Sequence, residues 1–344
     1  MGRRVAVVGA TGAVGREIVR ILEERSFPVG ELIPLASQRS EGVRIPFRDQ
    51  EPAVRTLTRE ALAGADLALV SAGASVSRAF VRDAAEDGVV IIDNSSAFRM
   101  DADVPLSIPE VNPEALEGSP RIVAVPNCTT ITAMMPIGPL HRAAGLRSLV
   151  LSSYQSVSGA GQRGIRELAE QVEKLHGTEE ALVHADAEAM PKGEVFGKTI
   201  AYNVVAKIGD FEPDGFTGEE SKMMAEPRKI LGLPDLQVAA TSVRVPVAVG
   251  HGVSILATFS REIGPDEARD VLRSAPGVQL RDDPANDVYP SPMEAAGIDE
   301  ALVGRIRRVP GRRDALLLFA CADNLRKGAA LNAVQIAERL LGSS

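Results

Sequence analysis

The residues best suited to covalent chemistry lie in the stretch VAVPNCTTI, from Val123 to Ile131. The apolar run from Arg121 to Val125 predicts a short buried strand, which Pro126 ends because proline cannot donate to a sheet ladder. A helix is expected to follow, to about Ala144, so Cys128 would lie near a helix N-terminus. Unpaired N–H groups and the positive end of the helix dipole favour a thiolate there, which is the nucleophilic form of cysteine.

The same N–H groups would hold an oxyanion formed when the sulfur attacks a carbonyl. The alternative interpretation is a small buried cysteine that closes a strand. The polar neighbours Asn127, Thr129 and Thr130 favour the chemical interpretation, because such residues are typical of a helix start.

His251 is the histidine best placed for chemistry, since it lies between two glycines beside a predicted turn. Antiparallel strands are expected on either side of it, over 237–249 and 252–260. Arg244 precedes it by seven positions, so one straight strand would place the two on opposite faces. Gly250 is therefore expected to break the strand. The other three histidines fall in polar helical stretches and are expected to be solvated: His141, His176 and His184.

Other polar residues stand out by position. Gln155 lies in a long strand-like run and is either functional or solvent-facing. Glu219 and Lys222 share one helix face, either in a site or as an exposed ion pair. Arg99 follows a predicted strand end, where it could grip an anion or cap a loop.

A strand, a glycine loop and a helix open the chain, which is the context of a dinucleotide-binding turn. The loop reads GATGAVG, from Gly9 to Gly15, and the alternative is a tight structural turn. The next predicted strand ends without the acid that binds a ribose diol. Ser37, Arg39 and Ser40 follow it and suit a 2′-phosphate, which indicates NADP(H) unless they form only a polar surface turn.

Strands alternate with helices over the first part of the chain, which predicts an α/β fold with a doubly wound parallel sheet. The 344 residues suggest roughly two domains. A net charge of −8 without a basic cluster argues against nucleic acid. No apolar run approaches the ~20 residues of a membrane span, and two cysteines favour a reducing cytoplasm. No Cys/His spacing predicts a metal site.

Eight motifs in order resemble the bacterial aspartate-β-semialdehyde dehydrogenase family over essentially the full chain: GATGAVG, ASQRS, DNSSAFR, VPNCTT, SYQSVSGAG, GEESK, RVPVAVGHG and DNLRKGAA. The resemblance implies a Rossmann-like NADP-binding domain over 1–127, completed by a helix over 325–344. It implies an α+β catalytic and dimerisation domain over 128–324, in a homodimer or a tetramer built from it. The implied reaction is NADPH-dependent reduction of L-aspartyl 4-phosphate to L-aspartate 4-semialdehyde and phosphate, in lysine, threonine and methionine biosynthesis.

The resemblance also implies roles for individual residues. Cys128 would be acylated, Gln155 would orient the substrate, and His251 would be the acid/base, for which an unshifted pKa near ~6.5 is suitable. The implied substrate contacts are Arg244 for the α-carboxylate, Glu219 for the amino group, and Arg99, Lys222 and Asn127 for the phosphate. The implied cofactor contacts are Gly9, Thr11, Gly12, Ala13 and Val14 at the pyrophosphate, Ser37, Arg39 and Ser40 at the 2′-phosphate, and Ser158, Gly159 and Asn324 near the nicotinamide.

Two alternatives remain at this point. N-acetyl-γ-glutamyl-phosphate reductase shares the fold and chemistry, but its nucleophile motif usually reads Gly-Cys, and its substrate has no free amine for Glu219. A non-catalytic homologue acting as a binding module should have lost Cys128 or His251, and both are present.

Overall fold

The structure, a computed structural model, describes residues 2–184 and 190–342 and divides into two compact units. The first unit comprises Met1–Pro139, Ala225–Leu236 and Leu325–Ser344, and the second comprises Leu140–Met224 and Gln237–Asn324. The functional division expected after residue 127 stays a prediction. Among the described residues, no helix combines the length and apolarity needed to cross a membrane.

The first unit is built on a parallel sheet of six strands in the order β3-β2-β1-β4-β5-β6. The strands are β1 (Arg3–Val8), β2 (Val29–Ala36), β3 (Arg55–Thr56), β4 (Leu67–Val70), β5 (Val90–Asp93) and β6 (Ile122–Ala124). The central strands are nearly all apolar because helices cover both faces of the sheet, as in other parallel sheets. The predicted Rossmann-like sheet is therefore confirmed.

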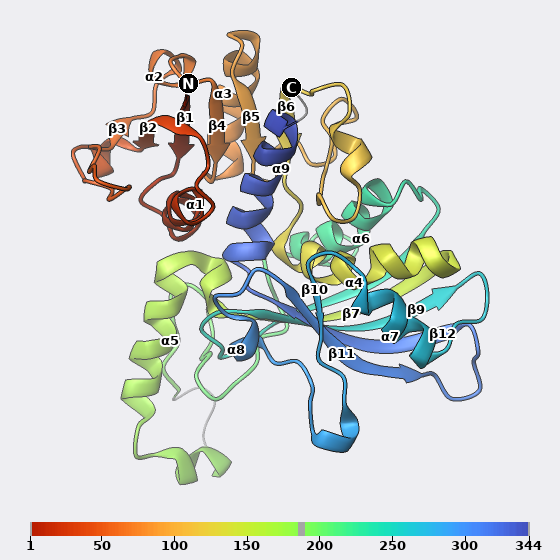
Figure 1. Ribbon diagram of the computed structural model, residues 1–344. Helices are drawn as coiled ribbons and strands as arrows, with labels where there is room; N and C mark the ends of the chain where they lie inside the picture. The colour runs from red at the N-terminus through yellow and green to blue at the C-terminus, as the bar shows by residue number, and fades with distance from the viewer. Residues whose placement is uncertain (1, 185–189, 343–344) are drawn as a thin grey trace. The chain divides into compact units, whose positions relative to one another are not determined.

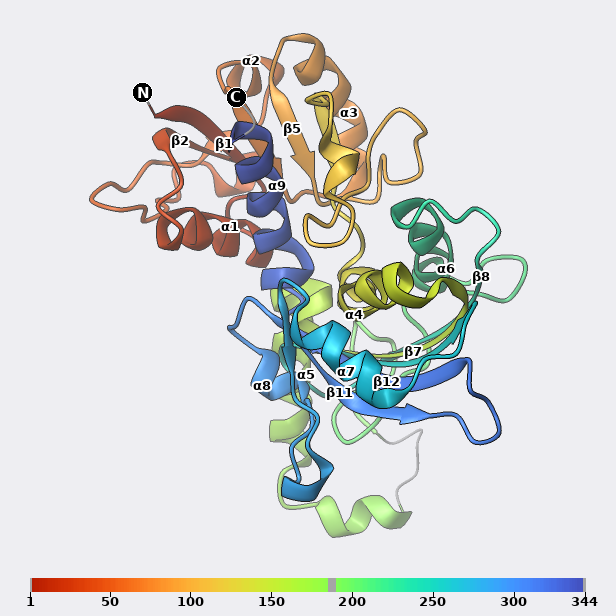
Figure 2. The same ribbon diagram turned by 45° about the vertical axis from the view of Figure 1, so that its right-hand side comes forward.

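Helices α1 (Ala13–Glu24) and α9 (Leu331–Gly342) contact each other on one face of this sheet, and α2 (Arg59–Ala63) and α3 (Ala74–Glu86) contact each other on the opposite face (Figures 1 and 2). Strand order reverses direction between β1 and β4, and ligands of such sheets bind where this reversal occurs. The unit also contains the start of α4 (Cys128–Ala144) and three short turns, η1 (Gln38–Ser40), η2 (Pro113–Leu116) and the π-helical η6 (Arg326–Ala330).

Two buried cations fix the C-terminal segment to the rest of the first unit. Arg326 pairs with Glu17 at 3.1 Å and with Glu24 at 2.7 Å. Lys327 is fully buried, and its Nζ donates to Glu110 Oε2 at 2.7 Å. Because every one of these partners lies far earlier in the sequence, the segment completes a unit that the N-terminal residues begin.

The second unit is built on a mixed six-stranded sheet in the order β10-β11-β12-β9-β7-β8. The strands are β7 (Leu146–Gln155), β8 (Gln237–Arg244), β9 (His251–Phe259), β10 (Val278–Leu280), β11 (Ala301–Arg308) and β12 (Ala315–Ala322). The helical segments are α5 (Gly161–Leu175), α6 (Gly218–Ile230), of which the second half belongs to the first unit, α7 (Pro265–Arg273), α8 (Pro292–Ala295), η3 (Val157–Ala160), η4 (Glu179–His184) and η5 (Pro284–Asn286).

The strands on either side of His251 are antiparallel but do not pair with each other. Strand β7 lies between them, parallel to β8 and antiparallel to β9. Strand β8 ends at Arg244 instead of continuing to residue 249, because Pro246 cannot donate to the ladder. Gly250 has a φ of +91°, so the expected break is present before β9 begins.

Strand β7 shows which face of this sheet is covered. Leu149, Leu151 and Gln155 are buried, whereas Val150 and Tyr154 on the other face are 46% and 41% exposed. The alternation is that of a sheet with one face packed and one face open.

Candidate active site

Four strand ends meet at one edge of the second unit's sheet. Parallel strands β7 and β8 end there side by side, with Gln155 in register with Arg244. Strand β9 begins at the same edge with His251, which lies opposite the last residue of β12, Ala322. The topology therefore gathers Gln155, Arg244, His251 and the residues after β12, which are separated by up to 169 positions.

His251 is fully buried, and its ring is oriented by Ser156. The backbone N–H of Ser156 donates to Nδ1 at 3.1 Å, and the hydroxyl of Ser156 lies 3.0 Å from the same atom. An Nδ1 that accepts an N–H bond leaves the proton of the neutral ring on Nε2. Nε2 is buried and has no partner among the described residues. An oxygen of a bound substrate would satisfy it.

Burial lowers the pKa of His251 to about 3, and the positive charge of Arg244 adds to this effect. The unshifted pKa expected from the sequence is therefore wrong, because the ring is removed from water. In this environment the imidazole is neutral across the physiological range, so it presents a donor N–H and no positive charge.

This shift makes the stability of the protein depend on pH. The folded state binds fewer protons at His251 than the unfolded state, so its stabilisation falls as pH drops below the unfolded pKa of ~6.5. At about pH 5 we expect His251 to lower the free energy of unfolding by about 2 kcal/mol relative to about pH 7.5. Urea unfolding at both pH values should show this extra loss in the wild type but not in His251→Asn. Equal pH dependence in the two proteins would contradict the depressed pKa.

Arg244 approaches the same serine from the neighbouring strand. Its Nη1 donates to the carbonyl oxygen of Ser156 at 2.7 Å, and its guanidinium lies 5.7 Å from the centre of the Phe196 ring. A Cβ at Gly159 would lie 2.8 Å from Nη1 of Arg244 and 3.6 Å from Nε2 of His251. Gly159 therefore leaves room for both side chains.

Gln155 is buried, which excludes the solvent-facing alternative. Its Nε2 donates to Glu219 Oε1 at 3.2 Å, and Lys222 Nζ donates to Oε2 of the same carboxylate at 3.2 Å. The side chain of Glu219 is only 9% exposed, whereas that of Lys222 is 37% exposed. The pair is thus half-buried, with a carboxylate that can accept an ammonium group.

Asn324 holds this arrangement together from the residues after β12. Its Oδ1 accepts from the hydroxyl of Ser156 at 2.9 Å and from the N–H of Gly250 at 2.9 Å. Its amide also contacts the Ser158 hydroxyl at 3.0 Å. Because Ser156 orients His251, Asn324 orients the histidine indirectly. Ser156 did not stand out from the sequence, where it is one serine among several.

Cys128 is the first residue of α4 in the first unit and is partly exposed. The side chain of Asn127 caps this helix, because its Oδ1 accepts from the N–H groups of Thr129 at 2.9 Å and Thr130 at 3.3 Å. These two amides are therefore paired, and the expectation of unpaired donors is wrong for them. The second cysteine, Cys321, is fully buried in β12, and burial raises the pKa of its thiol to about 12.

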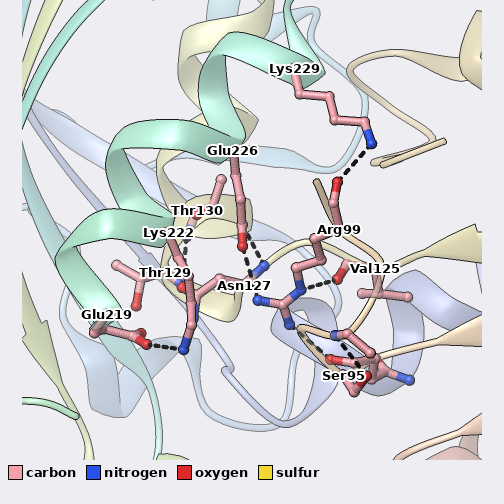
Figure 3. Close-up of polar contacts among 12 residues, drawn as sticks. Ser95, Arg99, Val125, Asn127, Thr129, Thr130, Glu219, Lys222, Glu226 and Lys229 are labelled. Atoms are coloured by element: carbon pink, nitrogen blue, oxygen red, sulfur yellow. Dashed lines mark hydrogen bonds and ion pairs between the residues drawn. The ribbon is translucent and has the colours of Figure 1, made fainter. Parts of the chain in front are cut away.

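Arg99 lies beside the segment that leads to Cys128 (Figure 3). Its Nε donates to the carbonyl oxygen of Val125 at 2.8 Å, and its Nη2 donates to that of Asn94 at 2.8 Å. Its Nη1 pairs with Glu226 at 2.9 Å. Sequence reasoning missed Glu226, although it continues the three-and-four spacing that Glu219 and Lys222 begin on α6.

The glycine loop after β1 fits a pyrophosphate. Gly9 has a φ of +81°, and a Cβ at Gly15 would lie 2.1 Å from the carbonyl oxygen of Gly9. Gly12 is the N-cap of α1, and no side chain caps this helix, so the amides of its first turn, at Ala13 and Val14, can receive a phosphate. The structure thus supports a dinucleotide at this turn.

The turn expected to bind a 2′-phosphate follows β2. Ser37 and Arg39 are exposed, and the Ser40 hydroxyl lies 3.2 Å from that of Thr11 in the glycine loop. Glu41 is the nearest acid in sequence, and its carboxylate accepts from the Thr56 hydroxyl at 2.9 Å. This turn therefore adjoins the glycine loop.

Within 2–184 and 190–342, no three His, Cys, Asp or Glu side chains are grouped to hold a metal. His176 and His184 are exposed, as expected. His141 differs, because it is partly buried and its Nδ1 accepts from the N–H of Leu146 at 3.0 Å. Burial lowers the pKa of His141, so the expectation of a solvated ring is wrong there.

Comparisons with known proteins show which family the chain resembles. Residues 4–119 match the family model "Semialdehyde dehydrogenase, NAD binding domain", and residues 137–327 match "Semialdehyde dehydrogenase, dimerisation domain". The aspartate-semialdehyde dehydrogenase of Aquifex aeolicus is 47% identical over 99% of this chain and 98% of its own. That of Bacillus subtilis is 43% identical over 98% of this chain and 97% of its own.

Solved structures give the same result. The crystal structure of aspartate semialdehyde dehydrogenase II from Vibrio cholerae, complexed with ASA, is 40% identical, covers 99% of both chains and has a TM-score of 0.92. None of these relatives is named as an N-acetyl-γ-glutamyl-phosphate reductase, so that alternative is not favoured. The chain belongs to the aspartate-semialdehyde dehydrogenase family.

Proposed function

We propose that this protein reduces L-aspartyl 4-phosphate to L-aspartate 4-semialdehyde and phosphate with NADPH. The near-full-length identity to enzymes of that name carries the proposal. Cys128 at the start of α4 supports it, because acyl transfer from a phosphate needs a nucleophile of this kind. The cytoplasmic location expected from the sequence stays a prediction.

In the proposed reaction the Cys128 thiolate attacks the acyl carbon, the bond from that carbon to the phosphate oxygen breaks, and a thioester remains. Arg99, Lys222 and Asn127 bind the departing phosphate. A bound reduced nicotinamide would supply the hydride. The carbonyl carbon of the thioester would receive it, and the π electrons of that carbonyl would move to its oxygen. The tetrahedral oxyanion then expels the sulfur, which releases the aldehyde and restores the thiolate.

His251 and Arg244 would act on the substrate's oxygens. The neutral ring of His251 carries its proton on Nε2, so it can donate to the oxygen that becomes negative. A substrate α-carboxylate on Arg244 would offset the charge that helps to lower the pKa of His251. Substrate binding would therefore raise that pKa and make the ring a better acid/base. Gln155 and Glu219 would orient the acyl group and the amino group.

An assay of the reverse reaction tests the function. The purified protein should reduce NADP⁺ when given L-aspartate 4-semialdehyde and phosphate together, but not with either alone. N-acetyl-glutamate semialdehyde should give no comparable rate, because it lacks the free amine that Glu219 would bind. Activity with N-acetyl-glutamate semialdehyde, together with no activity with L-aspartate 4-semialdehyde, would refute the proposal.

Cofactor preference gives a separate prediction. A guanidinium contact to a 2′-phosphate is worth about 1.5–3 kcal/mol, or about 10- to 150-fold in affinity. We expect kcat/KM to favour NADP(H) over NAD(H) by at least ~10-fold, and Arg39→Ala to remove most of this by weakening NADP(H). Steady-state kinetics with both cofactors measure it.

Arg44→Ala is a matched control, since Arg44 is an exposed arginine that donates to the carbonyl oxygen of Glu51 at 3.0 Å. It should keep the preference. Equal efficiency with both cofactors in the wild type would refute this assignment of the turn and leave the chemistry of Cys128 untouched.

The open face of the second sheet supports a homodimer. Val150 and Tyr154 are exposed on it, and the rings of Tyr154 and Phe319 lie 5.9 Å apart. Adjacent apolar and aromatic side chains of this kind are typical of a covered interface. Sedimentation equilibrium measures the mass in solution, and a single-chain mass at all concentrations would refute the dimer.

A further inference from the structure

Glu226 lies on the second half of α6 and is 1% exposed (Figure 3). Both oxygens of its carboxylate are used. Oε1 accepts from Nη1 of Arg99 at 2.9 Å, and Oε2 accepts from the backbone N–H of Asn127 at 2.7 Å. A buried carboxylate is costly unless it is paired and hydrogen-bonded. This one is paired with a phosphate-binding candidate and with the residue before Cys128.

Arg99 and Glu226 together hold the backbone on both sides of Pro126. Arg99 Nε donates to the carbonyl oxygen of Val125 at 2.8 Å, and Glu226 receives the N–H of Asn127. Pro126 itself has no N–H to contribute. The Arg99–Glu226 contact closes a ring of bonds around this segment. The start of α4 is thus fixed by a side chain that lies 99 positions further along the chain.

One turn later on α6, Lys229 holds the loop that carries Arg99. Its Nζ donates to the carbonyl oxygens of Arg99, Asp101 and Val104, each at 2.7 Å. These bonds fix the loop through its backbone but bring no negative charge to the guanidinium. Glu226 differs from Lys229 because its carboxylate offsets the positive charge of the guanidinium.

We propose that Glu226 is a positioning residue that fixes the segment preceding Cys128 and offsets the charge of Arg99. The inference rests on the function proposed above, in which Cys128 is acylated and Arg99 binds phosphate. An unopposed guanidinium would hold phosphate more tightly, and tighter binding of a leaving group does not speed its departure. The carboxylate keeps Arg99 in place and moderates its attraction for the product.

The experiment compares three variants in the phosphate-dependent reduction of NADP⁺. Glu226→Gln keeps the shape but removes the charge, and it can accept from only one of the two donors. We expect kcat to fall by about 10- to 100-fold and the KM for phosphate to fall by at least ~3-fold. Glu226→Asp keeps the charge but is one methylene too short, so kcat should fall without a lower KM for phosphate.

Glu220→Gln is the matched control on the same helix. Glu220 is also buried, and both of its carboxylate oxygens are also used, but its donors are two backbone N–H groups, those of Thr217 at 2.8 Å and Ser242 at 2.9 Å. It should lower the melting temperature and leave both kinetic constants near those of the wild type. Parallel loss of kcat and phosphate affinity in Glu226→Gln would show a merely structural role and overturn the proposal, as would a kcat within ~3-fold of the wild type.

Alkylation of Cys128 by iodoacetamide separates this inference from the proposed function, because it needs no substrate. Glu226 accepts from the N–H of Asn127, the residue before Cys128. Removing its negative charge should ionise more of the thiol, so Glu226→Gln should react at least ~3-fold faster at about pH 7. Glu220→Gln should react at the wild-type rate. A wild type that lacks semialdehyde activity would refute the proposed function only, whereas an unchanged alkylation rate in Glu226→Gln would refute the inference.

Discussion

Replacing Cys128 by serine is expected to lower kcat by at least ~10⁴-fold while the protein stays folded. A serine hydroxyl is far harder to ionise than a thiol, and nothing in the proposed chemistry would activate it. The ester that it could form would also expel its oxygen less readily than the thioester expels sulfur. Steady-state assays with aspartate semialdehyde and phosphate measure the loss, and a thermal melt checks the fold.

Cys321→Ser is the control for this change. Cys321 is fully buried in β12, and the pKa of its thiol is raised to about 12, so it should not react at neutral pH. The variant should lose some stability and keep its kcat. Peptide mapping after limited alkylation should find label on Cys128 alone. Selective labelling of Cys321 together with inactivation would reassign the nucleophile.

Replacement of His251 is expected to lower kcat by about 10²- to 10⁴-fold, the usual contribution of one acid/base. Alanine would also leave the N–H of Ser156 without its acceptor, so the fold would be strained by the same change. His251→Asn separates the two effects, because its Oδ1 can accept from Ser156 but it has no group at the position of Nε2. We expect this variant to fold and to be nearly as slow as His251→Ala.

His141→Asn is the matched control for that experiment. His141 also has a lowered pKa and also accepts a backbone N–H through Nδ1, that of Leu146. His141 has no part in the proposed reaction, so its replacement should leave kcat near that of the wild type. Near-normal turnover in a folded His251→Asn would move the role to water or another side chain.

The sequence was sufficient to predict the first sheet, because hydrophobic runs and glycine turns along a parallel sheet follow one another in order. It did not predict that β7 separates β8 from β9. Periodicity shows that a segment is a strand, but the choice of partner depends on packing between residues almost a hundred positions apart. The sequence identified Gln155, Arg244 and His251 as candidates. That they lie together follows only from the pairing of β7 with both β8 and β9.

Burial explains the errors at individual side chains. The pKa of His251 depends on its complete removal from water, and no local pattern around the two flanking glycines gives that exposure. The sequence predicts unpaired amides at the start of α4, whereas Asn127 caps those of Thr129 and Thr130, and this cap depends on a side-chain rotamer. Glu226 could have been noticed from the spacing of charges on α6, but its partners could not.

The anchoring of Arg326 and Lys327 has a consequence for how the protein is made. The first unit begins with β1, yet Arg326 pairs with Glu17, which lies 309 positions earlier in the sequence. Helix α9, which covers the sheet, comes still later in the chain. A ribosome that adds ~5–20 residues per second needs tens of seconds to travel that distance. Throughout that interval the nascent first sheet lacks one covering helix, whereas residues 140–324 emerge in full before it arrives. We therefore expect the second unit to finish folding on the ribosome before the first unit does. We also expect chaperones to bind the uncovered face of the first sheet during that interval.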